Sequence, residues 1–390
     1  MLERISVPLF LLSAAICACG DAVDVSPPTD GGVMSSHPHA DARDGSAPPV
    51  KVGACGALAA SGAWEDISPV RVMPGDAWAK NFSLGFLVDP FDPATVWLGT
   101  GYSGLWKSTD CGANWTEIST GRNRAAIEGG ALGDLVIDPV DRGVLYLVPI
   151  YGPGGVWKSA NGGVDWDQLI TSSPVGGNAM NVMAMDPSDH RHLVVGMHAN
   201  CDAPYNPTCE AESLDAGATW RFFKSPSSAE NNWEEGGNIF FIDSDSATWL
   251  YLGVHLWITK DHGGHWQNLT PDPSPIFGFH EVITGPDGTL YLSSGQGVSR
   301  STDGEHWTLI PNSGGSTVAL LHANGHFYAA DQWSATYRIA PDTDATMWSA
   351  LPAPAGLPKD QGTGALQYDV AHHLLYSANL AGGLWRVVTP

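Results

Sequence analysis

The sequence predicts an all-β fold, a single seven-bladed β-propeller of four-stranded antiparallel blades, and three observations support this prediction. The chain has 390 residues with 46 Gly, 28 Pro and 16 Trp but only 15% charged residues, which favours many turns and buried aromatic rings. An eight-residue pattern, Ser-x-Asp-x-Gly-x-x-Trp, recurs roughly every fifty residues, a period typical of propellers. A second pattern, two apolar strands joined by a turn, occurs seven times and gives the number of blades.

The eight-residue pattern predicts a hairpin turn between two strands. Its copies are Ser108–Trp115, Ser159–Trp166, Ser213–Trp220, Thr259–Trp266, the shorter Ser301–Trp307 and a degenerate copy near Pro341–Trp348. Short β-type runs flank the copies. Within the turn the Asp or Asn side chain can accept backbone N–H groups, Gly supplies a positive φ, and Trp buries a large ring beside the next strand.

The second pattern supplies the first two strands of each blade, A and B, and the eight-residue pattern joins strands C and D. The seven copies of this second, strand-turn-strand pattern are Phe86–Gly99, Leu135–Val148, Met183–Gly196, Phe240–Gly253, Val282–Ser293, Ala319–Ala330 and Leu366–Ala378. The chain ends on a C-type strand, Gly382–Val388, whereas Gly62–Ser68 reads as a D-type strand with no C strand before it. We therefore expect the N-terminal strand to complete the last blade and close the ring.

The first fifty residues predict export. Residues 1–19 contain Arg4 and a short apolar run, and Cys19 fits the lipidation position of the bacterial lipoprotein signal that this stretch resembles. An ordinary cleaved signal peptide is the alternative. Residues 20–52 are rich in Pro, Gly, Ser and Asp and predict a disordered tether, in which His37 and His39 are solvated. We expect residues 53–390 to form the propeller. From the N-terminal signal we expect an outer-membrane lipoprotein or a periplasmic or extracellular protein.

Four cysteines remain in this exported body, an even number that predicts disulfides. Of the three possible pairings we favour Cys201 with Cys209, which closes a short loop, and Cys55 with Cys111 then follows. The formal net charge of −23, with 18 Lys and Arg in total, excludes nucleic acid as a partner. We expect membrane contact only through an N-terminal lipid, a monomer, and no cofactor or metal.

The eight-residue pattern resembles the Asp-box, or bacterial-neuraminidase, repeat of sialidases, xyloglucan-type glycoside hydrolases, sortilin ectodomains and photosystem II assembly factors. The resemblance implies a propeller, but it does not decide the function, because enzymes and non-enzymes share the box. Leu132–Pro139 and Gly154–Trp166 look most like the repeats of the xyloglucan-type hydrolases. That resemblance implies glycoside hydrolase or polysaccharide lyase chemistry if the protein is an enzyme.

The motifs of the two enzyme families match this chain poorly. Sialidases use an Arg-x-Pro motif and three arginines, but Arg71 and Pro74 are spaced too far apart. Arg300, Arg338 and Arg386 occupy the C-strand position that Lys107 and Lys158 hold in other blades. Sialidase activity is therefore not favoured. The xyloglucan-type hydrolases pair two propellers and use an Asp in a Thr-Asp-x-Gly-Gly stretch, whereas this chain has Gly101 at that position.

Candidate functional residues lie on the face opposite the repeated turns. In a meander the A–B and C–D turns share one face, and the B–C loops and D–A connections share the other. The candidate catalytic residues on this second face are Glu234, Glu235, His255, His198 and Tyr102, and Glu281 or Glu128 is a candidate partner carboxylate. The candidate ligand-binding residues are Trp78, Asn81, Tyr151, Asn181, Trp233, His280, Gln296 and Trp333.

Aromatic rings, amides and carboxylates on one face are what sugar binding requires. We therefore expect recognition or cleavage of an oligo- or polysaccharide, and a non-catalytic propeller that binds a protein partner or assists assembly is the alternative. His198, His255 and His280 lie on three successive blades. They could converge as a catalytic base or as metal ligands with Glu234, or they could be separate surface residues.

Overall fold

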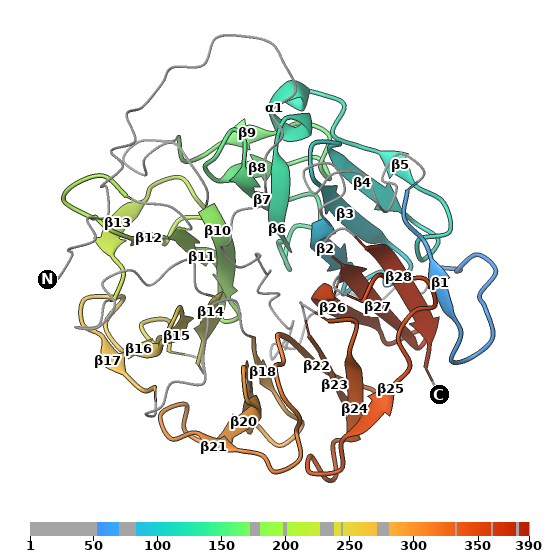
Figure 1. Cartoon of the computed structure of the whole chain (residues 1–390). Coiled ribbons are helices and arrows are strands. Elements are labelled where there is room, and N and C mark those ends of the chain that lie inside the picture. The colour runs from blue at the N-terminus through green and yellow to red at the C-terminus, as the bar shows by residue number, and fades with distance from the viewer. Residues whose placement is uncertain are drawn as a thin grey trace, which may run out of the picture. The chain divides into compact units, whose positions relative to one another are not determined.

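The computed structural model describes residues 53–69, 83–171, 180–197, 201–226, 238–242, 245–270, 281–331, 334–359, 362–379 and 382–389. These residues form seven four-stranded antiparallel sheets around a common centre (Figure 1). The predicted all-β, seven-bladed propeller is confirmed. The inner strands β2, β6, β10, β14, β18, β22 and β26 lie nearest the centre (Figure 1).

Each blade is a meander of consecutive strands, except for the blade that closes the ring. Blade 1 contains β2 (Ser83–Val88), β3 (Val96–Thr100), β4 (Leu105–Ser108) and β5 (Thr116–Glu117). Blade 2 contains β6 (Ala131–Ile137), β7 (Leu145–Tyr151), β8 (Trp157–Ser159) and β9 (Asp167–Gln168). Blade 3 contains β10 (Met180–Asp186), β11 (Asp189–Met197), β12 (Cys209–Ser213) and β13 (Arg221–Lys224).

The remaining blades repeat this order. Blade 4 contains β14 (Asn238–Phe241), β15 (Trp249–Leu252), β16 (Leu256–Thr259) and β17 (Gln267–Asn268). Blade 5 contains β18 (Val282–Thr284), β19 (Leu290–Ser294), β20 (Gly297–Ser301) and β21 (Thr308–Leu309). Blade 6 contains β22 (Ala319–Ala323), β23 (His326–Ala330), β24 (Tyr337–Pro341) and β25 (Ser349–Leu351). Blade 7 contains β26 (Thr363–Asp369), β27 (Leu374–Asn379), β28 (Gly383–Val388) and β1 (Trp64–Asp66).

The N-terminal strand β1 completes blade 7, as the sequence predicts. It pairs antiparallel with β28, with Trp64 opposite Val387 and Asp66 opposite Trp385, and Figure 1 shows the two strands side by side. The indole nitrogen of Trp115, in the first eight-residue turn of blade 1, donates to the Ile67 carbonyl at 2.7 Å. The closing segment therefore contacts both the last blade and the first.

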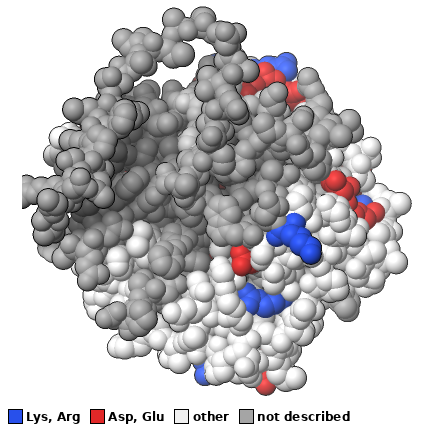
Figure 2. Space-filling view, viewed as in Figure 1, with Lys and Arg blue, Asp and Glu red and all other residues white. Residues whose placement is uncertain are grey.

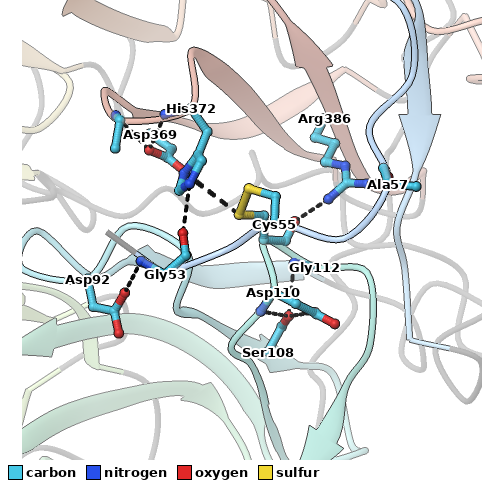
Figure 3. Close-up of a disulfide and its surroundings, with 12 residues drawn as sticks. Gly53, Cys55, Ala57, Asp92, Ser108, Asp110, Gly112, Asp369, His372 and Arg386 are labelled. Carbon is cyan, nitrogen blue, oxygen red and sulfur yellow. Dashed lines mark hydrogen bonds and ion pairs between the residues drawn. A yellow bond between two sulfur atoms is a disulfide. The ribbon is translucent and has the colours of Figure 1, made fainter. Parts of the chain in front are cut away.

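Both predicted disulfides are present, Cys55–Cys111 and Cys201–Cys209. The first joins the segment before β1 to the eight-residue turn of blade 1, and side chains of blade 7 hold the same segment (Figure 3). The His372 ring lies 2.9 Å from the Gly53 carbonyl, and Arg386 donates to the carbonyls of Ala57 and Cys111. We call the Cys55–Cys111 disulfide and these bonds of His372 and Arg386 the clasp. The clasp fixes the N-terminal segment between blades 7 and 1.

The eight-residue turns have the predicted local structure. In the first turn the Ser108 hydroxyl donates to Asp110 at 2.7 Å and accepts the Gly112 N–H at 2.9 Å. Gly112 has a φ of 92°, which a side chain would disfavour. These turns are scaffolding that fixes the connection between strands C and D.

Apolar side chains fill the spaces between neighbouring blades, and polar side chains tie some inner strands together. Between blades 1 and 2 the core includes Trp97, Leu135, Leu147 and Trp166. The Asp134 carboxylate on β6 accepts the Met183 N–H of β10 at 2.9 Å, a side-chain bond that links two inner strands. Within the described ranges, no helix has the length and apolar character needed to span a bilayer.

Candidate functional site

The face formed by the B–C loops and D–A connections contains six predicted residues whose side chains the structure describes: Tyr102, Glu128, Tyr151, His255, Glu281 and Gln296. The other predicted residues outside the described ranges are Trp78, Asn81, His198, Trp233, Glu234, Glu235, His280 and Trp333, and so is Cys19. Asn181 belongs to β10, but its side chain is not described. Their roles therefore stay predictions.

Tyr102 lies in the B–C loop of blade 1, which is anchored to blade 2. Its N–H donates to the Gly130 carbonyl at 2.8 Å, and Gly101 forms a β-bridge with Ala131. The residue has a φ of 58°, uncommon for a tyrosine, and its side chain is 42% exposed. The loop thus presents an aromatic ring to solvent from a backbone held at two points.

Tyr151 ends β7 and pairs with the same residue, Ala131. Residues 130 and 131 therefore position both tyrosines. Tyr102 comes from blade 1, and Tyr151 comes from blade 2. A Cβ on Gly130 would lie 3.1 Å from the Tyr151 carbonyl oxygen and 3.0 Å from Pro153, so this position has little room for a side chain. The structure brings these two predicted residues to one part of the face.

His255 and Gln296 lie in the B–C turns of blades 4 and 5. The His255 ring packs edge-on against Trp257 with centroids 6.2 Å apart, and the exposed Gln296 donates its N–H to the Ser294 hydroxyl at 3.2 Å. Tyr102 and His255 come from blades 1 and 4. The structure therefore places these two candidate catalytic residues on blades that are not neighbours.

Glu281 precedes β18 at the inner edge of the same face. Its N–H donates to the Ser293 hydroxyl at 2.8 Å, and its carboxyl accepts the Leu320 N–H of blade 6 at 2.7 Å. Burial raises the pKa of Glu281 to about 8, against the lowering effect of the Leu320 bond, and the Asp134 carboxylate raises it further. Glu281 therefore holds a proton at neutral pH, which the sequence alone did not indicate.

The described part of the face that Figure 2 shows carries few charged side chains. Figure 2 shows one face of the molecule, where basic and acidic side chains are scattered singly or in small groups on the described part. Arg124 of the short helix α1 (Arg124–Glu128), in the connection between blades 1 and 2, is paired with Glu117 and Glu128. This surface suits a neutral ligand better than a polyanion.

A second group of polar residues, which was not predicted from the sequence, lies between blades 3 and 4. We call Asp186, His192, Glu212, Arg221 and His262 the blade 3–4 cluster. The His192 ring lies 3.1 Å from Asp186 through Nδ1 and 3.0 Å from Glu212 through Nε2. The Nδ1 atom of His262 lies 2.6 Å from the same Glu212 oxygen, and Arg221 donates to the other oxygen at 2.6 Å.

The pKa shifts in this cluster follow from its contacts. Burial alone would raise the pKa of Glu212, but hydrogen bonds with His192, Arg221 and His262 lower it to about 2. Burial alone would lower the pKa of His192, but the bonds to Asp186 and Glu212 raise it. A position-by-position comparison of the repeats is the signal that could have identified this cluster.

Comparison with known proteins relates the chain to xyloglucan-degrading enzymes. It is 27% identical over 255 residues to a xyloglucanase from Paenibacillus sp, covering 62% of this chain and 21% of that enzyme. It is 24% identical over 315 residues to a xyloglucanase from Hypocrea jecorina, covering 71% and 34%. The chain thus spans about a third or less of the length of these curated relatives. No protein-family model matches it.

Solved structures share the fold. YCF48 bound to D1 peptide is similar over 87% of this chain and 100% of that chain, with a TM-score of 0.58 and 13% identity. The GH74 xyloglucanase from Xanthomonas campestris is similar over 83% and 53%, with a TM-score of 0.57 and 18% identity. The protein is a seven-bladed propeller. In sequence it is distantly similar to xyloglucanases.

Proposed function

We propose that the protein recognises a neutral polysaccharide such as xyloglucan on the face of the B–C loops and D–A connections. The sequence similarity to xyloglucanases, which covers 62% of this chain in one case and 71% in another, carries the proposal. The positions of Tyr102 and Tyr151 support it, because the two residues lie at one part of this face and aromatic rings stack on sugar rings.

Titration with xyloglucan oligosaccharides, followed by calorimetry, tests this proposal. We expect Tyr102→Ala to weaken binding about tenfold, the effect of losing about 1.4 kcal/mol of stacking and burial. Val370→Ala is the matched control, because Val370 is 64% exposed and lies in the A–B turn of blade 7, on the opposite face. Equal affinity of Tyr102→Ala and the parent protein would contradict the proposal.

Cleavage is the finer part of the proposal, with Glu281 as the general acid. Glycoside hydrolysis requires a carboxyl group that stays protonated at neutral pH, and Glu281 has this property. We expect Glu281→Gln to keep oligosaccharide affinity within about twofold but to release fewer reducing ends by at least about a hundredfold. Absorbance of unsaturated products distinguishes a lyase. A parent protein that binds xyloglucan but releases no product is a binding protein.

The alternative is a propeller that binds a protein partner. Its support is the similarity to YCF48 bound to D1 peptide, a chain matched over its whole length. A peptide array incubated with the same two variants tests it. Under this alternative, Tyr102→Ala weakens peptide capture, Val370→Ala does not, and the oligosaccharides produce no heat of binding.

We also propose that the chain is exported and lipidated at Cys19, as an outer-membrane lipoprotein. The two disulfides support export, because such bonds persist in oxidising compartments. Labelling of expressing bacteria with a palmitate analogue should mark the parent chain, and Cys19→Ala should remove both the label and the membrane-bound fraction. An unlabelled parent chain in the soluble fraction would identify an ordinary secreted protein.

A further inference from the structure

We propose that the blade 3–4 cluster binds a divalent transition-metal ion, best matched by Zn²⁺, through His192, Glu212 and His262. One ligand atom of each residue lies within 4.8 Å of the others. Glu212 Oε1 is central, at 3.0 Å from His192 Nε2 and 2.6 Å from His262 Nδ1. Two imidazoles and one carboxylate form a ligand set that zinc accepts, with a fourth position left for water or another ligand.

The neighbours of these three residues orient them toward a common point. Asp186 contacts His192 Nδ1 and thereby directs Nε2 toward Glu212, an arrangement that metal-binding histidines use. Arg221 occupies the second oxygen of Glu212, so Oε1 is the oxygen directed at both histidines. His192 is 1% exposed, whereas the His262 side chain is 39% exposed and leaves a route from solvent.

The cluster departs from the repeat at the position of Glu212. This residue directly precedes the first residue of the eight-residue turn. In blades 1, 2 and 5 the same position holds Lys107, Lys158 and Arg300. A basic residue on the C strand is therefore the repeated choice, and blade 3 replaces it with a metal-ligating carboxylate.

The two histidines are departures at the same interface. His192 precedes the residue of strand B that pairs with the start of the turn, a position held by Thr95 in blade 1 and Val144 in blade 2. His262 is the fourth residue of its turn, with a φ of 57°, and the same position holds Cys111 in blade 1 and Ala216 in blade 3. Three changes to ligand residues thus coincide between two blades.

The charges at the interface suit a divalent cation. Asp186, Glu212 and Asp245 are carboxylates, and Asp245 lies close enough to His262 and Asp186 for their charges to shift its pKa. Arg221 supplies one positive charge, so with neutral imidazoles three negative charges against one positive leave a net −2. A divalent ion would cancel that charge.

Zinc titration of the full chain by calorimetry tests the proposal. The tether histidines are removed first by His37→Ala and His39→Ala, so that they contribute no background binding. We expect this protein to bind one equivalent of Zn²⁺ and His262→Ala to bind it at least about a hundredfold more weakly. His265→Ala is the matched control, because His265 lies in the same turn, has a side chain that is 94% exposed and bonds to Asp261, outside the three proposed ligands.

A second readout separates metal binding from a purely structural role of the histidines. Co²⁺ bound by nitrogen and oxygen ligands has visible absorption, which should develop in the parent protein and the His265→Ala variant but not in His262→Ala. Zn²⁺ should raise the melting temperature of the same two proteins only. Absence of saturable binding, or equal Zn²⁺ affinity of His262→Ala and His265→Ala, would overturn the proposal. Titration with xyloglucan oligosaccharides tests the proposed sugar site separately, because that site lies on the opposite face from His262.

Discussion

Glu281 illustrates how the position of one residue in the ring changes its chemistry. Its carboxyl lies where an inner strand begins and accepts a backbone N–H from the next blade, and the negative charge of Asp134 raises its pKa. A sequence pattern places Glu281 on the correct face, but its pKa depends on which neighbouring blade covers it. The proximity of His192, Glu212 and His262 could likewise not be predicted from the sequence, because strand pairing and blade contact bring them together.

The raised pKa of Glu281 predicts a stability that falls as the pH rises. The unfolded chain ionises this group near pH 4.5 and the folded chain near pH 8, so between these values the folded state binds more protons. The group should therefore lower the free energy of unfolding by at most about 1.4 kcal/mol per pH unit over this interval. Urea unfolding of the parent and of Glu281→Gln at pH 5, 6.5 and 8, values within the interval between the two pKa values, measures the difference. Parallel profiles would contradict it.

At the scale of elements, the sequence predicted the strands and turns of the blades much better than the arrangement of the loops. Seven strand-turn-strand copies and the eight-residue turns identified the blades, because each pattern depends on neighbours within a few residues. The site residues instead lie in loops whose arrangement depends on other blades. Tyr102 and Tyr151 are both positioned by residues 130 and 131, which no spacing in the sequence indicates.

The two disulfides differ in the element that each one fixes, and this predicts different stabilities. Cys55–Cys111 closes a separation of 56 residues and holds the segment before β1, whereas Cys201–Cys209 closes 8 residues within one loop. Loop-closure entropy predicts losses of about 4 and about 2.5 kcal/mol on their removal. Guanidinium unfolding of Cys55→Ser/Cys111→Ser and of Cys201→Ser/Cys209→Ser measures both losses. The reverse order would show that the clasp does not depend on its disulfide.

At the scale of the molecule, ring closure joins the two ends of the propeller sequence. Strand β1 provides the fourth strand of blade 7, while the segment that precedes it is bonded to blade 1. This closure was predictable because one strand type was missing at the end of the chain and present in excess at its beginning. The glycine and tryptophan content indicated the class of fold, but only the count of strand types indicated how the ring closes.

Ring closure by β1 predicts that order along the chain affects the rate of unfolding. In a permuted chain, residues 53–69 are moved to follow residue 390, so that blade 7 consists of consecutive strands and no longer links the two ends. Both chains carry Cys55→Ser and Cys111→Ser, which removes the disulfide from the comparison. We expect the permuted chain to keep the native circular dichroism spectrum, because every strand pair can still form.

The permuted chain should nevertheless unfold at least about tenfold faster in guanidinium, because separating blades 7 and 1 then breaks no strand pairing within a blade. Tryptophan fluorescence after rapid dilution into denaturant measures the rate, since Trp115 and Trp385 lie against the closing segment. Deletion of residues 53–69 is the companion variant, and it should lose the native spectrum because the edge of β28 is left without its partner. Equal unfolding rates of the permuted and parent chains would mean that contacts between blades 7 and 1 hold the ring without help from β1.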